Sequence, residues 1–101
     1  MRLPKATTED ELQTKVDELA LTDPQQEVRE EAIRHITDQK LLEQVALNDK
    51  VSILERSTAI GKITDIPTLW RIHDTVYELH QWNLAWIAGE RIADLDNARG
   101  R

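Results

Sequence analysis

Residues 32–42 read AIRHITDQKLL, and residues 59–69 read AIGKITDIPTL. The shared Ile-Thr-Asp occupies 36–38 and then 63–65, which is 27 positions later (63 − 36 = 27). A weaker copy, Ile-Ala-Asp, begins at Ile92 after a further 29 positions (92 − 63 = 29). A fixed period of this size is typical of supersecondary units that stack on one another.

A second phrase repeats upstream, as LALTD at 19–23 and VALND at 45–49. An alanine also stands four positions before each of the three copies, at Ala32, Ala59 and Ala88. A side chain this small allows neighbouring helices to approach closely. Two phrases repeated in the same order, together with the alanines, predict three similar units.

The composition favours helices joined by tight turns. The 101 residues include only three Gly and three Pro, and 40% are hydrophobic and 32% charged. Such a chain has few turn breakers and enough apolar residues for an ordered core. At this length we expect one domain, residues 1–101.

Capping residues and apolar residues at helical spacing predict two helices in each unit. The expected helix starts are Thr7 or Thr8 with Glu11 in a capping box, Asp23 followed by Pro24, Asp38, Asn48 or Asp49, Asp65 with Pro67 in the first turn, and Val76 preceded by a Thr75/Glu78 capping box. The residues expected to face inward are Leu12, Val16, Leu19, Val28, Ala32, Ile33, Ile36, Leu41, Leu42, Val45, Ala46, Ile53, Leu54, Ser57, Ile60, Ile63, Leu69, Trp70, Ile72 and Val76. The helices would pair over units 8–36, 38–63 and 65–93, and the sixth would end near Ile92, before a polar tail at 94–101.

The repeated joints predict the fold class. Thr-Asp would end one helix and cap the next, so each pair should stack on the last at a similar angle. We therefore expect an all-α fold, a short right-handed α-solenoid of three antiparallel helix pairs with six helices in total.

The units resemble HEAT-like repeats, of the short variety seen in bacterial proteins, over about residues 9–94. In that family an Asp in the turn and an Arg on the second helix form a ladder between units. The resemblance implies such a ladder at Asp23 with Arg29 and at Asp49 with Arg56, whereas Ala85 stands where the third Arg would be. It also implies a non-catalytic role as a scaffold or binding surface.

Aromatic residues gather in the last third of the chain, and none occurs among the first 69 residues. They are Trp70, Tyr77, Trp82 and Trp86. Trp82 and Trp86 are four apart and share one helix face. An aromatic stripe most often fills a core, which is the first interpretation here. The second is an exposed surface that docks a partner or a second copy, because Trp and Tyr are common interface anchors.

Cations occur along the second helix of each unit, where they would line the concave side. They are Arg29, Arg34, Arg56, Lys62 and Arg91, and Glu27, Glu30, Glu31, Glu55 and Glu90 share those helices. This mixture favours a solvated face over a phosphate-binding row. The net charge of −6 also disfavours nucleic-acid binding, since phosphate neutralisation drives that affinity.

Other chemistry has little support in the sequence. The stretch HDTVYELH at 73–80 has no zinc-motif spacing, and the chain contains no cysteine. No residue is nominated as a nucleophile beside an oxyanion site. We therefore expect no metal, no cofactor and no enzymatic activity. The first 13 residues lack a secretory apolar region, and no apolar stretch approaches about 20 residues, so a cytoplasmic protein without a membrane span is expected.

The best functional hypothesis is a non-catalytic protein-interaction module that binds a partner through the concave helix face or through an aromatic surface on the last helix. The candidate partner-binding residues are Trp82, Trp86, Tyr77, Arg34, Lys62 and Arg91. Alternatives are the end of a longer repeat assembly, a homodimer, or a nucleic-acid-binding HEAT-like domain.

Overall fold

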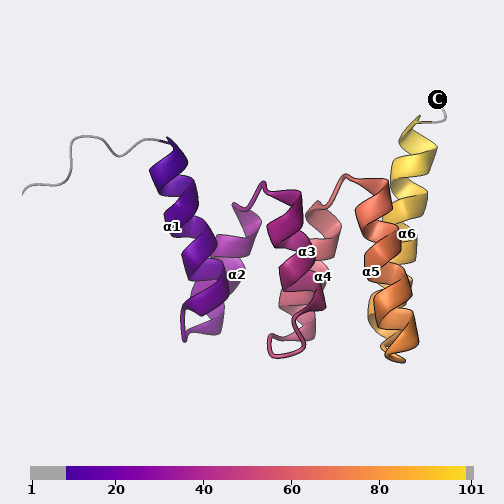
Figure 1. Ribbon diagram of the computed structural model, residues 1–101, viewed down its shortest axis with the longest axis horizontal. Coiled ribbons are helices and arrows are strands. Elements are labelled where there is room, and N and C mark those ends of the chain that lie inside the picture. The colour runs from indigo at the N-terminus through magenta and orange to yellow at the C-terminus, as the bar shows by residue number, and fades with distance from the viewer. Residues whose placement is uncertain (1–8, 100–101) are drawn as a thin grey trace, which may run out of the picture.

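The computed structural model describes residues 9–99, and every regular element in that range is an α-helix (Figure 1). The helices are α1 (Glu9–Thr22), α2 (Gln26–Arg34), α3 (Gln39–Leu47), α4 (Ile53–Lys62), α5 (Ile66–Glu78) and α6 (Trp82–Arg99). The expected all-α class and the six helices are confirmed for this part of the chain.

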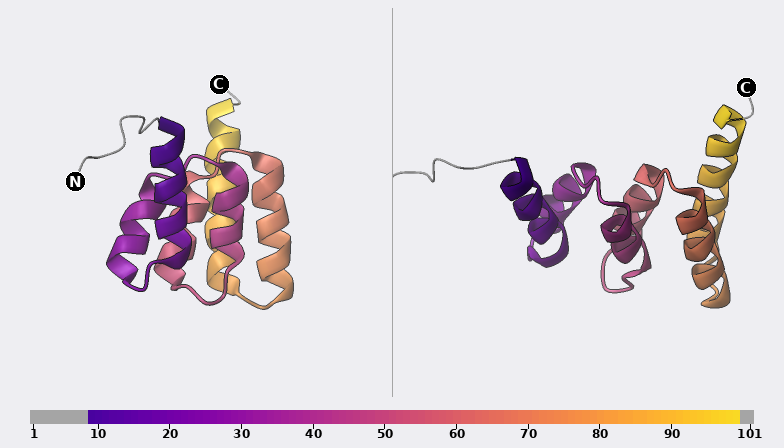
Figure 2. Two further views of the ribbon diagram at one scale, coloured as in Figure 1. Left: turned by 60° about the vertical axis from the view of Figure 1, so that its left-hand side comes forward. Right: turned by 45° about the horizontal axis from the view of Figure 1, so that its top comes forward.

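Consecutive helices pack as three pairs, α1 with α2, α3 with α4 and α5 with α6. The pairs stand side by side in chain order, and the middle pair lies between the other two (Figures 1 and 2). Neighbouring pairs meet through α2 with α4, α4 with α6 and α3 with α5. The result is a slab of about 50 × 34 × 17 Å, with odd-numbered helices along one side and even-numbered helices along the other.

Two of the expected aspartate caps are confirmed. Asp38 precedes α3, and its carboxylate accepts hydrogen bonds from the backbone N–H groups of Lys40 and Leu41. Asp65 precedes α5 and accepts from the N–H of Thr68. Each cap satisfies donors that the first helical turn cannot satisfy itself. These are the two aspartates of the repeated Ile-Thr-Asp.

Two other expected caps are wrong. The N-cap of α2 is Gln25, and the Asp23 carboxylate accepts instead from the Gln25 N–H within the turn. Helix α4 begins after Ser52, because Ser52 and Glu55 form a full capping box and so satisfy two free donors reciprocally. Asn48 and Asp49 lie in the turn that precedes it.

The predicted boundaries of the last two helices are also wrong. Helix α5 continues through Val76 to Glu78, and α6 begins at Trp82. A left-handed residue, His80 with φ of 60°, separates them. The expected polar tail from residue 94 is helical as far as Arg99. The Thr7 or Thr8 start lies outside the described residues.

The core runs through all three pairs and consists mainly of the expected aliphatic residues. Fully enclosed members include Ile33, Ile36, Leu42, Val45, Ile60, Ile63, Leu69, Ile72, Val76 and Leu84. Leu12, Ile53, Leu54 and Trp70 were expected inside but are about half exposed. Once Ser52 sets the start of α4, the inward positions of its first turn fall on Glu55 and Arg56, which are buried.

Polar contacts join each pair to the next at a nearly constant distance along the chain. Their sequence separations are 26 for Arg29 with Glu55, 25 for Arg56 with Gln81, 25 for Gln39 with Thr64, 28 for Glu43 with Arg71, 28 for Arg34 with Lys62, and 28 for Ile63 with Arg91. These separations bracket the 27-residue sequence period. The repeat seen in the sequence therefore coincides with the register in which the pairs are joined.

Candidate functional site

The aromatic side chains of α5 and α6 lie on the surface. Trp86 is 69% exposed, Tyr77 56%, Trp82 53% and Trp70 49%. The interpretation of these residues as core is wrong. Aliphatic residues and alanines fill the interior of this pair, so four large rings remain in contact with solvent.

The exposed rings are held against one another in a chain. Trp70 and His73 pack edge to face at a centroid distance of 5.4 Å, and His73 stacks on Tyr77 at a centroid distance of 5.8 Å. Tyr77 in turn meets Trp82 at 5.1 Å in an edge-to-face arrangement. These distances and angles are those that aromatic quadrupoles favour. Mutual packing restricts the ring rotamers, so the surface is partly preorganised.

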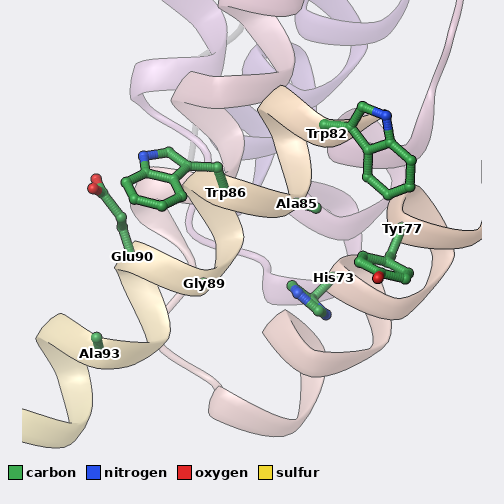
Figure 3. A pocket seen from close by; sticks show the side chains of 8 residues that line it. All are labelled: His73, Tyr77, Trp82, Ala85, Trp86, Gly89, Glu90 and Ala93. Atoms are coloured by element: carbon green, nitrogen blue, oxygen red, sulfur yellow. The ribbon is translucent and has the colours of Figure 1, made fainter. Parts of the chain in front are cut away.

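A groove of about 460 Å³ opens between the rings. It is lined by His73 and Tyr77 of α5 and by Trp82, Ala85, Trp86, Gly89, Glu90 and Ala93 of α6 (Figure 3). Ala85, Gly89 and Ala93 recur every four residues, so they form a floor of small side chains. Trp82 and Trp86 rise on either side of Ala85 (Figure 3). Large rings beside small residues on one helix create the concavity.

The turn at His80 positions the two helices. The N–H of Gln81 donates to the carbonyl of Val76, and the N–H of His80 donates to that of Tyr77. This is a Schellman motif, in which the left-handed position is normally Gly. The His80 ring also packs against Trp82 at 5.2 Å. The tight reversal brings Trp82 directly beside Tyr77.

The groove lies on the side of the third pair that faces away from α3 and α4. Contacts toward the middle pair come from other positions on both helices: Arg71 pairs with Glu43, and the Arg91 Nε donates to the Ile63 carbonyl. On α5, the stripe of Trp70, His73 and Tyr77 is offset from Arg71 around the helix. In Figure 1 this side forms the outer end of the row of helices.

Equivalent positions in the middle pair are polar and join it to the third pair. Gln39 accepts from the N–H groups of Thr64 and Asp65, Glu43 binds Arg71, and Arg56 donates to Gln81. The repeat period relates these residues to positions in the third pair. Gln39 and Glu43 on α3 correspond to Ile66 and Trp70 on α5, 27 residues later (39 + 27, 43 + 27). Arg56 on α4 corresponds to Ala85 on α6, 29 residues later (56 + 29). The outer face of the third pair therefore lacks the polar groups by which the middle pair binds the third.

The expected ladder residues make different contacts from those that the resemblance implies. Arg29 donates to the backbone carbonyl of Asp23 and forms a two-point ion pair with Glu55 of the next pair, at 3.0 and 3.1 Å. Burial opposes ionisation of Glu55, but hydrogen bonds from Arg29 and Ser52 outweigh it and hold the Glu55 pKa below its ordinary value. The hydrogen bond to Glu55 in turn raises the Arg29 pKa.

Arg56 is buried, and no carboxylate among residues 9–99 lies at salt-bridge distance from it. It donates to the carbonyl of Ala46 at 2.8 Å and to the side-chain oxygen of Gln81 at 2.9 Å. Burial lowers the pKa of Arg56 below its ordinary value, and the charge of Asp49 acts in the opposite direction. Asp49 therefore acts on Arg56 only through its charge.

The other candidate cations are also engaged within the chain. Lys62 donates to the carbonyl of Arg34, and Arg91 to that of Ile63. Both carbonyls lie at the C-terminal end of a helix in the preceding pair, where a cation is favoured. Arg34 itself pairs with Glu31 on the surface. These contacts point to the aromatic groove as the better candidate site.

Neither a metal site nor a membrane span emerges from the described part of the chain. Within residues 9–99 no group of three or more His, Asp or Glu side chains could hold a metal ion. His73 and Asp74 of the HDTVYELH stretch interact with each other at 3.2 Å. Over the same range, no helix combines the length and apolar character needed to cross a bilayer.

Comparison of the chain with protein-family models, with curated proteins and with solved structures gave no match in any of the three.

Proposed function

We propose that this chain is a non-catalytic protein-interaction module, a short right-handed HEAT-like solenoid that binds its partner through the aromatic groove of α5 and α6. The observation that carries the proposal is the exposure of Tyr77, Trp82 and Trp86 around one concavity. Trp and Tyr side chains dominate the energetics of protein interfaces because each buries a large area with few rotatable bonds. Left in water, they lose the hydrophobic stabilisation that a partner would supply.

The groove serves a foreign partner better than a further repeat of the same kind. The middle pair binds the third through carboxylate, amide and guanidinium groups, in Glu43, Gln39 and Arg56. The third pair has Trp70, Ile66 and Ala85 at the corresponding positions. This difference favours an interaction module over the alternative of a repeat array that continues beyond the third pair.

Affinity capture with matched variants tests the proposal. The tagged chain, its Trp82→Ala/Trp86→Ala variant and a Leu54→Ala control would be exposed to lysate from the source organism. Leu54 is 59% exposed on α4, so the control also removes an exposed apolar side chain, away from the groove. Circular dichroism would verify that all three remain helical.

We expect a set of proteins that the wild type and the Leu54→Ala control retain and that the double Trp variant loses. Equal capture by all three would reject the groove as the binding surface. Light scattering on the isolated chain distinguishes a foreign partner from a second copy of this chain. A dimer that dissociates in the double Trp variant would replace the foreign partner with a second copy.

A further inference from the structure

We infer that the groove recognises a basic amphipathic segment of a partner protein, whose Lys or Arg side chains lie over the indole faces of Trp82 and Trp86 and reach Glu90. This inference rests on the proposed function and adds the chemistry of the partner. Three features of the third helix pair carry it: the charges at the groove, the charges around it and the aromatic walls.

The groove itself is electronegative. Glu90 is the single carboxylate among its lining residues, and no Lys or Arg lines it. Glu90 stands one helical turn from Trp86, and its carboxylate extends beside that indole ring (Figure 3). An apolar partner would have to leave the Glu90 charge at the edge of a desolvated contact. A cationic side chain would provide a counter-ion for it.

The helices around the groove also have a net negative charge. Residues 65–99 contain six carboxylates, at Asp65, Asp74, Glu78, Glu90, Asp94 and Asp96, against three guanidinium groups, at Arg71, Arg91 and Arg99. Two of the three, Arg71 and Arg91, are directed to the middle pair, Arg71 to Glu43 and Arg91 to the Ile63 carbonyl. The third pair therefore has an excess of negative charge, which attracts a basic partner and repels an acidic one.

The aromatic walls suit cations in particular. The face of an indole ring is electron-rich, and Trp is the most effective aromatic side chain for binding Lys or Arg by a cation–π interaction. The small floor of Ala85, Gly89 and Ala93 leaves room for the alkyl part of such a side chain. Between Trp82 and Ala93 the helix rises by about 17 Å, which matches an amphipathic helix of three turns.

The experiment uses two 14-residue amphipathic peptides with the same leucine stripe, one with Lys and one with Gln at every polar position. Binding would be followed by the indole N–H resonances of ¹⁵N-labelled protein, which contains three Trp residues. We expect the Lys peptide to shift the Trp82 and Trp86 signals and to bind about three- to tenfold more tightly than the Gln peptide.

Variants locate the binding and separate it from general charge attraction. A Cβ at Gly89 or at Gly61 would meet nothing within 4 Å, so both positions accept a side chain, and only Gly89 lines the groove. Gly89→Leu should weaken Lys-peptide binding at least tenfold, and the Gly61→Leu control should leave it unchanged. Glu90→Gln should reduce the affinity about threefold without altering the helical content.

Equal binding of both peptides at Trp82 and Trp86 would overturn the basic partner and leave the apolar groove as an interaction site. Lys-peptide binding that survives Gly89→Leu, or that shifts neither indole signal, would overturn the inference as well. Shifts of the same two signals on concentrating the protein without peptide would assign the groove to a second copy and would equally overturn it. The lysate experiment tests the proposed function separately from the peptide experiment. Equal capture by the wild type and both variants would reject the groove as the binding surface, whatever the peptides show.

Discussion

Replacing Glu55 with Gln should uncouple the first helix pair from the second. The Glu55 side chain is fully buried, and it is the point at which Arg29 of α2 is tied to α4 by two hydrogen bonds. Gln has the same shape and can still accept a hydrogen bond from Ser52. It cannot present two acceptor oxygens to Arg29, however, so a guanidinium donor loses its partner.

The magnitude follows from the burial of the two groups. Removing one member of a buried ion pair costs about 3–5 kcal/mol. Arg29 is 18% exposed and keeps its hydrogen bond to the Asp23 carbonyl, so water and that carbonyl compensate in part. We therefore expect Glu55→Gln to lower the free energy of unfolding by about 2–3 kcal/mol. That is a large share of the 5–15 kcal/mol typical of a small domain.

Urea unfolding followed by circular dichroism measures this change. With an m value of about 1 kcal/mol per molar, the midpoint should fall by about 2–3 M. The control is Glu31→Gln, which removes an ion pair that is more than 60% exposed on both sides and should leave the midpoint nearly unchanged. Equal midpoints for the two variants would refute the stabilising role of the buried pair. Hydrogen exchange should show the loss concentrated in α1 and α2.

The same pair predicts a dependence on pH. The Glu55 pKa is lowered from 4.5 by folding, so the ionised form is the one that the fold stabilises. The contribution of Glu55 to the free energy of unfolding is complete above the pKa that this carboxyl has in the unfolded chain. It is lost as the pH falls through the pKa that the carboxyl has in the folded protein. The stability difference between wild type and Glu55→Gln should therefore be constant from neutral pH to about pH 5 and shrink at lower pH. A difference that grows on acidification would contradict this assignment.

Three further substitutions should each raise the urea midpoint. Gly61→Ala should stabilise α4 by about 1 kcal/mol, because the new methyl group meets nothing within 4 Å and Ala is the better helix former; a lower midpoint would mean that α4 needs the flexibility of Gly. Gln81→Glu should raise the free energy of unfolding by about 1 kcal/mol, because Arg56 then gains a carboxylate near the start of α6. An unchanged urea midpoint would imply that the buried charge of Arg56 is already balanced. His80→Gly should add up to about 1 kcal/mol by relieving the left-handed conformation; a loss would show that the ring contact with Trp82 outweighs that strain.

Much of the fold could be predicted from the sequence because local chemistry coincides with the tertiary period. The repeated Ile-Thr-Asp places an N-cap at Asp38 and again at Asp65, and both cap as expected. The aliphatic positions of α3 and α5 also face the core. At these points a single residue determines the local structure, so no knowledge of distant contacts is needed.

The errors arose where two local signals compete or where none exists. Asn48, Asp49 and Ser52 can each cap a helix, so the start of α4 has three candidates. Ser52 is the cap because Glu55, three positions later, completes a capping box with it. The reversal at His80 contains no Gly or Pro, so nothing in the sequence marks the end of α5.

The clustering of the aromatic residues was evident in the sequence, but their exposure was not. An i, i+4 spacing places Trp82 and Trp86 on one face of a helix without saying what covers that face. The deciding information is tertiary: Leu84, Ala88 and Ile92 occupy the inward side of α6, so the indoles are left outside. The small floor of the groove could have been recognised from Ala85, Gly89 and Ala93 at a spacing of four.

The order of the three pairs in a row has a consequence for communication along the molecule. The middle pair separates the first and last pairs (Figure 1). A coupling between a ligand held by the tryptophans and the opposite end would therefore pass through α3 and α4. Residues such as Arg56 and Glu55, which touch neither end surface, are where such long-range coupling would be transmitted or interrupted.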